Sequence, residues 1–123
     1  MADKSGGELV VINQDEAAVG LRAATVLPLA IIQAGPKAEE KFFEFFTAQI
    51  PNPNTRMAYL RAVRRFFAWA EEVKLGLAQI RPVHVAAYIQ LLGRDLEPPS
   101  VKQHLAAVRM LFNYFVVGQV MET

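Results

Sequence analysis

The stretch that decides the fold is residues 54–73, which read NTRMAYLRAVRRFFAWAEEV. Its apolar residues recur at spacings of three and four, which is typical of one face of an amphipathic helix of about five turns. The apolar face is formed by Leu60, Val63, Phe66, Phe67, Ala70 and Val73. Asn54 or Thr55 is expected to cap this helix, with Pro53 just outside it.

Positive charge lies on the opposite side of the same helix. At about 100° per residue, Arg61 and Arg65 lie opposite the apolar face, and Arg64 lies on its flank. Between Asn54 and Ala70 the sequence has four arginines and no acidic residue. We therefore predict that one face of this helix enters a core while the other carries uncompensated positive charge.

The length and composition are those of one globular domain. With 123 residues, of which 53% are hydrophobic, the chain can bury a core. It has no cysteine, which excludes disulfide scaffolds and thiol nucleophiles and fits a reducing compartment. The apolar run at residues 23–32 is too short to span a bilayer and contains Pro28, and no secretory signal frames it. We predict a cytoplasmic protein without a membrane partner.

The two halves of the chain differ in charge. Residues 1–53 carry four basic and seven acidic groups, whereas residues 54–123 carry nine basic and five acidic groups. The overall net charge of +1 hides this asymmetry. A phosphate-binding surface is therefore expected in the second half.

The first 35 residues are expected to form a flexible or partly ordered tail, because they show no sustained period. Within them, residues 23–34 have the pattern of a short helix broken at Pro28. The Gly35-Pro36 pair is a strong punctuation signal, so we place the start of the folded domain there and extend it to residue 123. The apolar group at residues 9–12 stands alone in the tail.

Four helical patterns follow this boundary. The first covers residues 37–49, has phenylalanines on one side, and is ended by Pro51 and Pro53. The second is the arginine-bearing stretch, which we expect to stop near Gly76. The third opens at Pro82 and ends at Gly93. Each of these patterns has the helical period, and no segment alternates like a strand.

The fourth pattern is expected to be capped by Ser100 and to end at Gly118. Its apolar residues are Val101, Leu105, Val108, Phe112 and Phe115. The sequence therefore predicts an all-α bundle of four helices joined by short loops. The chain stops soon after the fourth helix, and we expect it to be a fragment cut at a linker.

No catalytic or metal-binding pattern is present. Ser5 and Ser100 are not in a nucleophile elbow, and the glycines do not form a phosphate-binding loop. His84 and His104 are predicted on separate helices without further ligands at metal-binding spacing. We expect no metal and no cofactor. The tyrosines fall at core spacing and are expected to pack inside: Tyr59, Tyr88 and Tyr114.

The basic face allows two interpretations. A charged helix face is often merely solvated, in which case the domain would be a helical protein–protein interaction module. Three features favour DNA instead: arginine in place of lysine, the lack of acids at helical pairing distance, and a second set of polar residues on the fourth helix. This second set is Lys102, Arg109 and Asn113, with the small Ala106 between them. Two such helices suit docking in the major groove.

The helical patterns also resemble a known family. Residues 54–69 contain N-T-x-x-A-Y-x-x-A-V-x-x-F-x-x-W, which resembles the second helix of the core-binding domain of tyrosine recombinases, the phage integrase family that includes Xer-like proteins. Residues 79–92, QIRPVHVAAYIQLL, and residues 99–120, PSVKQHLAAVRMLFNYFVVGQV, resemble its third and fourth helices. The phenylalanine-rich residues 37–49 correspond to the first helix. The resemblance covers about residues 37–121.

This resemblance implies a SAM-like orthogonal bundle that grips one face of a recombination half-site with its second and fourth helices. The partner would be double-stranded DNA, and the fragment alone is expected to be monomeric. The resemblance also implies three core residues: Tyr59, Trp69 and Leu105. The candidate DNA contacts are Thr55, Arg56, Arg61, Arg64, Arg65, Ser100, Lys102, Gln103 and Arg109.

The resemblance further implies that the first helix contacts other protomers in a synaptic tetramer, so one residue among Phe42, Phe43 and Phe46 is expected to be exposed. It also places the family's catalytic arginines, lysine, histidines and tyrosine nucleophile in a C-terminal domain that this chain lacks. Tyr114 is therefore not expected to be a nucleophile. The parent protein would be a recombinase or integrase acting through a 3′-phosphotyrosyl intermediate, and this fragment would bind DNA without cutting it.

Overall fold

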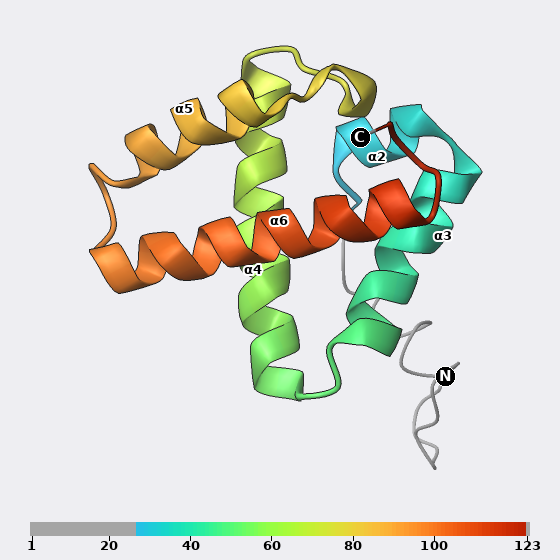
Figure 1. The fold of residues 1–123 in the computed structure, drawn as a ribbon, viewed down its shortest axis with the longest axis horizontal. Coiled ribbons are helices and arrows are strands. Elements are labelled where there is room, and N and C mark those ends of the chain that lie inside the picture. Colours follow the sequence, from blue (N-terminus) through green and yellow to red (C-terminus); the bar gives the residue numbers. More distant parts are fainter. Residues whose placement is uncertain (1–26, 123) are drawn as a thin grey trace, which may run out of the picture.

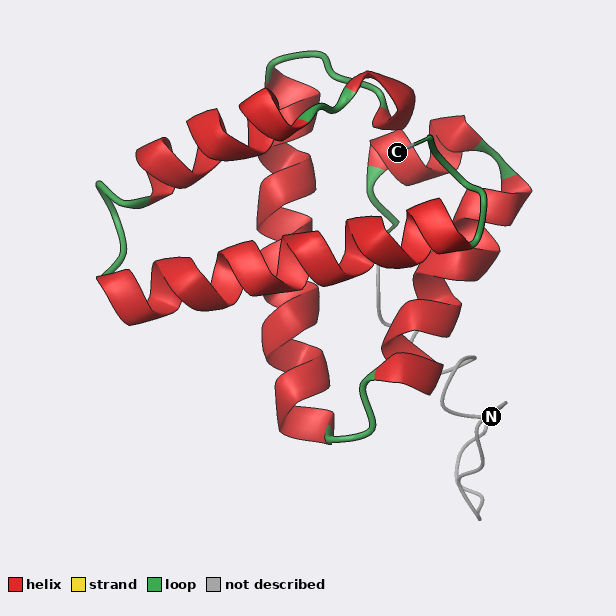
Figure 2. Ribbon diagram, viewed as in Figure 1, coloured by secondary structure: helices red, strands yellow, loops and turns green. Residues whose placement is uncertain are grey.

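The structure is a computed structural model that describes residues 27–122, and this part of the chain is helical without a strand (Figure 1, Figure 2). A π-helical turn, Phe45–Gln49, continues the second of its five α-helices, and a 3-10 turn, Leu77–Gln79, precedes the fourth. The α-helices are α2 (Leu29–Ala34), α3 (Pro36–Glu44), α4 (Pro53–Glu72), α5 (Pro82–Leu92) and α6 (Pro98–Val117). The all-α prediction is confirmed, with α3 to α6 as the four expected helices.

The bundle is built around the crossing of its two long helices. Figure 1 shows α6 running across α4, with α5 beside one half of α6 and α3 at its other end. The contacts agree, because α4 packs chiefly against α6, while α3 and α5 also pack on α6. One end of α6 therefore packs against α3, and α5 lies beside the other half.

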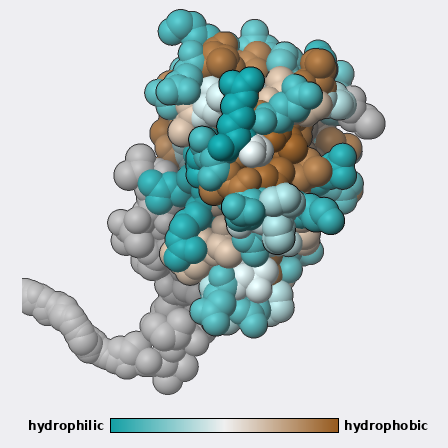
Figure 3. All heavy atoms as spheres, turned by 90° about the vertical axis from the view of Figure 1, so that its left-hand side faces the viewer, coloured by the Kyte–Doolittle hydropathy of each residue, from teal (hydrophilic) through white to brown (hydrophobic). Residues whose placement is uncertain are grey.

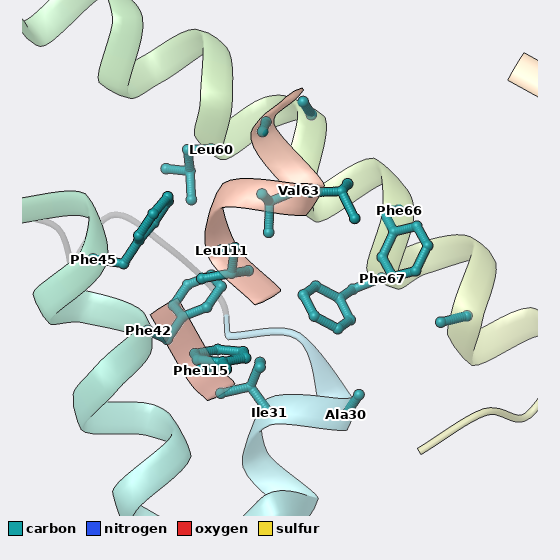
Figure 4. Close-up of a cluster of buried hydrophobic side chains, with 14 of the residues drawn as sticks. Ala30, Ile31, Phe42, Phe45, Leu60, Val63, Phe66, Phe67, Leu111 and Phe115 are labelled. Carbon is teal, nitrogen blue, oxygen red and sulfur yellow. The ribbon is translucent and has the colours of Figure 1, made fainter. Parts of the chain in front are cut away.

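The core is dominated by phenylalanine rings that meet edge to face. The rings of Phe42 and Phe46 lie 5.1 Å apart, and those of Phe66 and Tyr88 also lie 5.1 Å apart. Figure 4 shows side chains from α2, α3, α4 and α6 converging in this cluster. The largest fully buried side chains include Phe42, Phe45, Phe46, Phe66 and Phe115.

Two predictions about the first part of the chain were wrong. Phe42, Phe43 and Phe46 are all buried, so none of them is left exposed for another protomer. The folded unit also begins before Gly35, because Ala30 and Ile31 of α2 belong to the core. Gly35 has a φ of 103°, which favours glycine, and joins α2 to α3 instead of separating a tail from a domain. Residues 1–26 lie outside the described part.

The starts of α4 and α6 differ from the predicted caps. Asn52 caps α4, because its Oδ1 accepts hydrogen bonds from the backbone N–H groups of Asn54 at 2.9 Å and Thr55 at 3.1 Å. The N-cap of α6 is Glu97, so Ser100 lies inside the first turn. In both helices a proline is the first residue, where its missing N–H costs no helical hydrogen bond.

A polar contact fastens the C-terminal half of α6 to α3. The Tyr114 hydroxyl donates a hydrogen bond to Glu44 Oε1, and Lys41 Nζ lies 2.9 Å from the same oxygen. These hydrogen bonds hold the pKa of the Glu44 carboxyl below its usual value of 4.5, the bond from Tyr114 contributing most. Burial and the adjacent carboxylate raise the pKa of Tyr114 to about 12. The phenol is thus a neutral donor at physiological pH.

Among residues 27–122, no helix combines the length and the apolar character needed to cross a bilayer. The same residues contain no group of three or more His, Asp or Glu side chains that could hold a metal ion. His84 has a local role instead, since its Nδ1 accepts the backbone N–H of Arg81 at 2.9 Å at the start of α5.

Candidate nucleic-acid interface

The exposed face of α4 carries three arginines. Arg61, Arg64 and Arg65 are all exposed, as the helical pattern predicted. Arg61 and Arg65 are four residues apart and therefore neighbours on one face. Within residues 27–122, neither Arg61 nor Arg64 makes an ion pair or a side-chain hydrogen bond. Their guanidinium groups are free to bind an anion.

Arg65 does have an acidic partner. Its Nη2 lies 3.3 Å from Asp95 Oδ2, in the connection between α5 and α6. The two side chains are 45% and 66% exposed, so water screens the pair and its contribution to stability is small. The sequence showed no acid at helical spacing, and the structure supplies one from 30 residues further along.

A cavity adjoins Arg65, with two buried polar groups nearby. The cavity, of about 280 Å³, is lined by Arg65, Trp69, Tyr88 and Asp95 among others. Within the described residues, the Tyr88 hydroxyl and His104 Nδ1 are buried without a hydrogen-bond partner. Burial, with a smaller effect of Arg65, lowers the pKa of His104 below 6.5, so the imidazole is neutral at physiological pH. The ion pair with Asp95 and the effect on His104 both place Arg65 near the start of α6.

Arg56 and Thr55 differ in their availability. Arg56 is half-buried and donates from Nε to the carbonyl of Ile50 at 3.1 Å and from Nη2 to that of Pro51 at 3.3 Å. Its guanidinium therefore fixes the connection between α3 and α4. Thr55 is exposed in the first turn, where Asn52 already accepts its backbone N–H, so its hydroxyl is the group open to a ligand.

Arg64 lies on a different side of α4 from Arg65. It lines a cavity of about 180 Å³ together with Leu27 and Pro28, which precede α2, and Glu71. This separates it from the neighbourhood of α6. Arg64 is therefore a flanking residue of the basic face.

The candidate residues of α6 are exposed but form two groups. Ser100, Lys102 and Gln103 lie in its first turns. Arg109 lies about two turns further on and borders a groove between α5 and α6. Leu105 also lines this groove, is only partly buried and does not belong to the core cluster, which corrects the prediction that it is a core residue. Tyr59 and Trp69 do pack against the core as expected.

The comparison with protein families adds to this geometry. Residues 40–117 match the family model described as phage integrase, N-terminal SAM-like domain. The chain belongs to this family. The match runs from within α3 to the end of α6, the four helices on which the sequence resemblance rests. No curated protein and no solved structure matched the chain.

Phage integrase N-terminal domains belong to a family of site-specific recombination and DNA binding, which fits DNA as the partner of the basic face. The match is to the N-terminal SAM-like domain alone and includes no catalytic domain.

The sequence placed Arg61 and Arg65 on the exposed face, and it missed Asp95 and the position of His104. Both depend on how separate helices pack, which no local pattern shows.

Proposed function

We propose that this phage integrase SAM-like domain binds double-stranded DNA through α4 and the first turns of α6, as the half-site-binding part of a site-specific tyrosine recombinase. The observation that carries the proposal is the exposed pair Arg61 and Arg65 on one face of α4, where Arg65 also pairs with Asp95 in the connection that leads into α6. Guanidinium groups bind phosphate oxygens strongly, and an α-helix fits the major groove. The chain would contribute to DNA recombination and integration by positioning DNA.

Exposure and local contacts support an order among the candidate contacts in this proposal. Arg61 and Arg65 would contact phosphates from α4, with Thr55 at its start. Arg64 and Arg109 would contact DNA only at the edges of the surface, and Arg56 would act indirectly by fixing the connection before α4. The contacts from α6 would be those of its exposed first turns: Ser100, Lys102 and Gln103.

The test is a titration of a fluorescent duplex with the protein at low and moderate salt, read by anisotropy. The variant Arg61→Glu plus Arg65→Glu is expected to weaken binding by roughly a hundredfold, because each lost charged contact is worth about 1.5 kcal/mol. The dependence of log K on log salt should also fall by about two units, one for each phosphate contact removed.

The matched control is Lys37→Glu plus Lys74→Glu, which changes the net charge equally at exposed sites on other parts of the domain. This control should retain most of the affinity. Equal losses in both variants would show that only net charge matters and would refute a defined interface. A wild-type domain that is helical by circular dichroism but does not bind DNA at low salt would favour the protein-interaction module.

A further inference from the structure

Helix α5 carries more apolar surface than the bundle covers. Its sequence, PVHVAAYIQLL, is apolar nearly all round, and a helix of that kind is normally buried on every side. Tyr88 and Leu92 do enter the core. Val83 and Leu91, however, are 67% and 41% exposed. The helix therefore has an apolar side directed away from the core.

A groove runs between α5 and α6, and its lining on α5 is a different set of residues from Val83 and Leu91. Its volume is about 600 Å³, within the range of about 300–1,000 Å³ typical of ligand-binding sites. Val85 and Ile89 line it from α5, and Leu105, Phe112 and Val116 line it from α6. Figure 3, which views the end of the domain where α5 connects to α6, shows hydrophobic surface bordered by hydrophilic side chains.

The border of the groove is mainly positive. Arg81 lies at the start of α5 and Arg109 on α6, and Glu122 is the one acidic residue that lines the groove in the described part. Arg109 makes no ion pair or side-chain hydrogen bond within residues 27–122. An occupant that complements this groove is an apolar segment with acidic residues beside it.

The chain itself contains such a segment outside the described residues. Residues 8–16 read ELVVINQDE, so four consecutive apolar residues are followed closely by Asp15 and Glu16 and preceded by Glu8. The proposed DNA interface makes no use of this segment. Its composition matches both the apolar lining and the positive border of the groove.

We propose that residues 8–16 dock in the α5–α6 groove of the same chain. The 14 residues 13–26 can span about 46 Å when extended, which exceeds a domain diameter of about 30 Å and makes the groove accessible. A tether of this kind gives an effective concentration in the millimolar range, so even a weak intrinsic affinity produces substantial occupancy. This inference does not depend on the proposed DNA binding.

Spin labelling tests the docking in the full chain. The sequence has no cysteine, so Asn13→Cys provides a single site for a nitroxide next to the apolar residues. We expect paramagnetic broadening of the amide signals along the groove, at Val85, Ile89, Leu105 and Val116. Signals of α3 should keep their intensity. If the groove signals are no more broadened than those of α3, the proposal is wrong.

A matched pair of variants tests which residues dock. Leu9→Asn plus Val11→Asn, added to the labelled chain, should abolish the broadening by removing apolar contacts without changing charge. Val19→Asn plus Leu21→Asn makes a comparable change outside residues 8–16 and should leave it intact. Persistent broadening in the first variant would contradict docking by this segment.

Mixing separates docking within one chain from exchange between copies. Isotope-labelled protein without the nitroxide is mixed with unlabelled protein that carries it, so any broadening observed must come from a second copy. Docking within one chain predicts no broadening in the mixture. Broadening of the groove signals there would show that the occupant comes from a second copy and would overturn the proposal.

Discussion

Two faces of α6 meet very different surroundings, although both are apolar. One face contributes Leu111 and Phe115 to a core in which both side chains are at most 1% exposed. The face toward α5 carries Leu105, Phe112 and Val116 along an open groove, and on α5 itself Val83 is 67% exposed. Similar hydrophobicity thus contributes to stability on one face and leaves an open apolar surface on the other. The difference arises because neighbouring helices cover the first surface completely and leave the second open to solvent.

The largest expected effect on stability lies in the buried core. Phe66→Ala should lower the free energy of unfolding by about 3–5 kcal/mol, because it removes a fully buried ring and leaves a cavity. The ring packs against those of Phe67, Tyr88 and Phe112, which cannot all move to fill the space. Urea denaturation followed by circular dichroism measures this change.

Val83→Ala in the open region is the counterpart, and it should change the free energy of unfolding by less than about 0.5 kcal/mol because the side chain is largely exposed. The contrast between the two regions requires a large difference between these variants. A loss of several kcal/mol from Val83→Ala would show that the exposed side of α5 is covered in solution.

A smaller effect is expected where α6 is fastened to α3. Tyr114→Phe removes the hydrogen bond that the phenol donates to the Glu44 carboxylate, and should cost about 1 kcal/mol because the site is only partly buried. Thermal unfolding at neutral pH measures the loss. The control Tyr59→Phe, on α4, has no side-chain hydrogen bond among the described residues and should be nearly neutral.

The same contact predicts a dependence on acid. The pKa of Glu44 is lower in the folded state than its ordinary 4.5, so its contribution to stability is complete above that pH and is lost as the pH falls below it. Glu44→Gln should therefore flatten the stability curve in this acidic range. An unchanged curve, measured by urea denaturation at stepped pH, would show that other carboxylates cause the acid dependence.

The sequence predicted the regular helices well and their junctions poorly. The spacing of Leu60, Val63 and Phe67 identified the buried face of α4, because a period of 3.6 is a local property. The caps were misplaced because Pro53 and Pro98 were expected outside the helices, whereas each begins one. The helix α2 was left out of the domain because Gly35-Pro36 resembles a boundary, and the contacts of Ile31 with the core are not visible in local sequence.

The candidate interface was predictable to a similar degree. Exposure of Arg61 and Arg65 follows from the position of each residue on α4. The partners of the arginines do not, because they depend on tertiary packing. Arg56 binds backbone carbonyls before its own helix, and Arg65 meets an aspartate 30 residues away. The sequence therefore identifies the basic face, and the structure shows which of its charges are free.

The smallest expected effect concerns that aspartate. Asp95→Asn should strengthen DNA binding by about two- to fivefold, because a phosphate would no longer compete with the carboxylate for Arg65. The gain is modest since an exposed ion pair is worth at most about 1 kcal/mol. Anisotropy titration with the same duplex measures it, and the gain should shrink as salt screens the pair in the wild type.

Glu72→Gln is the control that separates pairing from general electrostatics. Glu72 lines the same cavity as Arg65 and Asp95, and it makes no ion pair or hydrogen bond with Arg65 in the described structure. Its replacement removes one negative charge close to the same arginine while leaving the Arg65–Asp95 contact in place. A larger gain for Asp95→Asn would show that the ion pair itself restrains Arg65, and hence that the connection between α5 and α6 influences the basic face of α4. Equal gains would show that Asp95 acts only through its negative charge and that its ion pair with Arg65 has no additional effect.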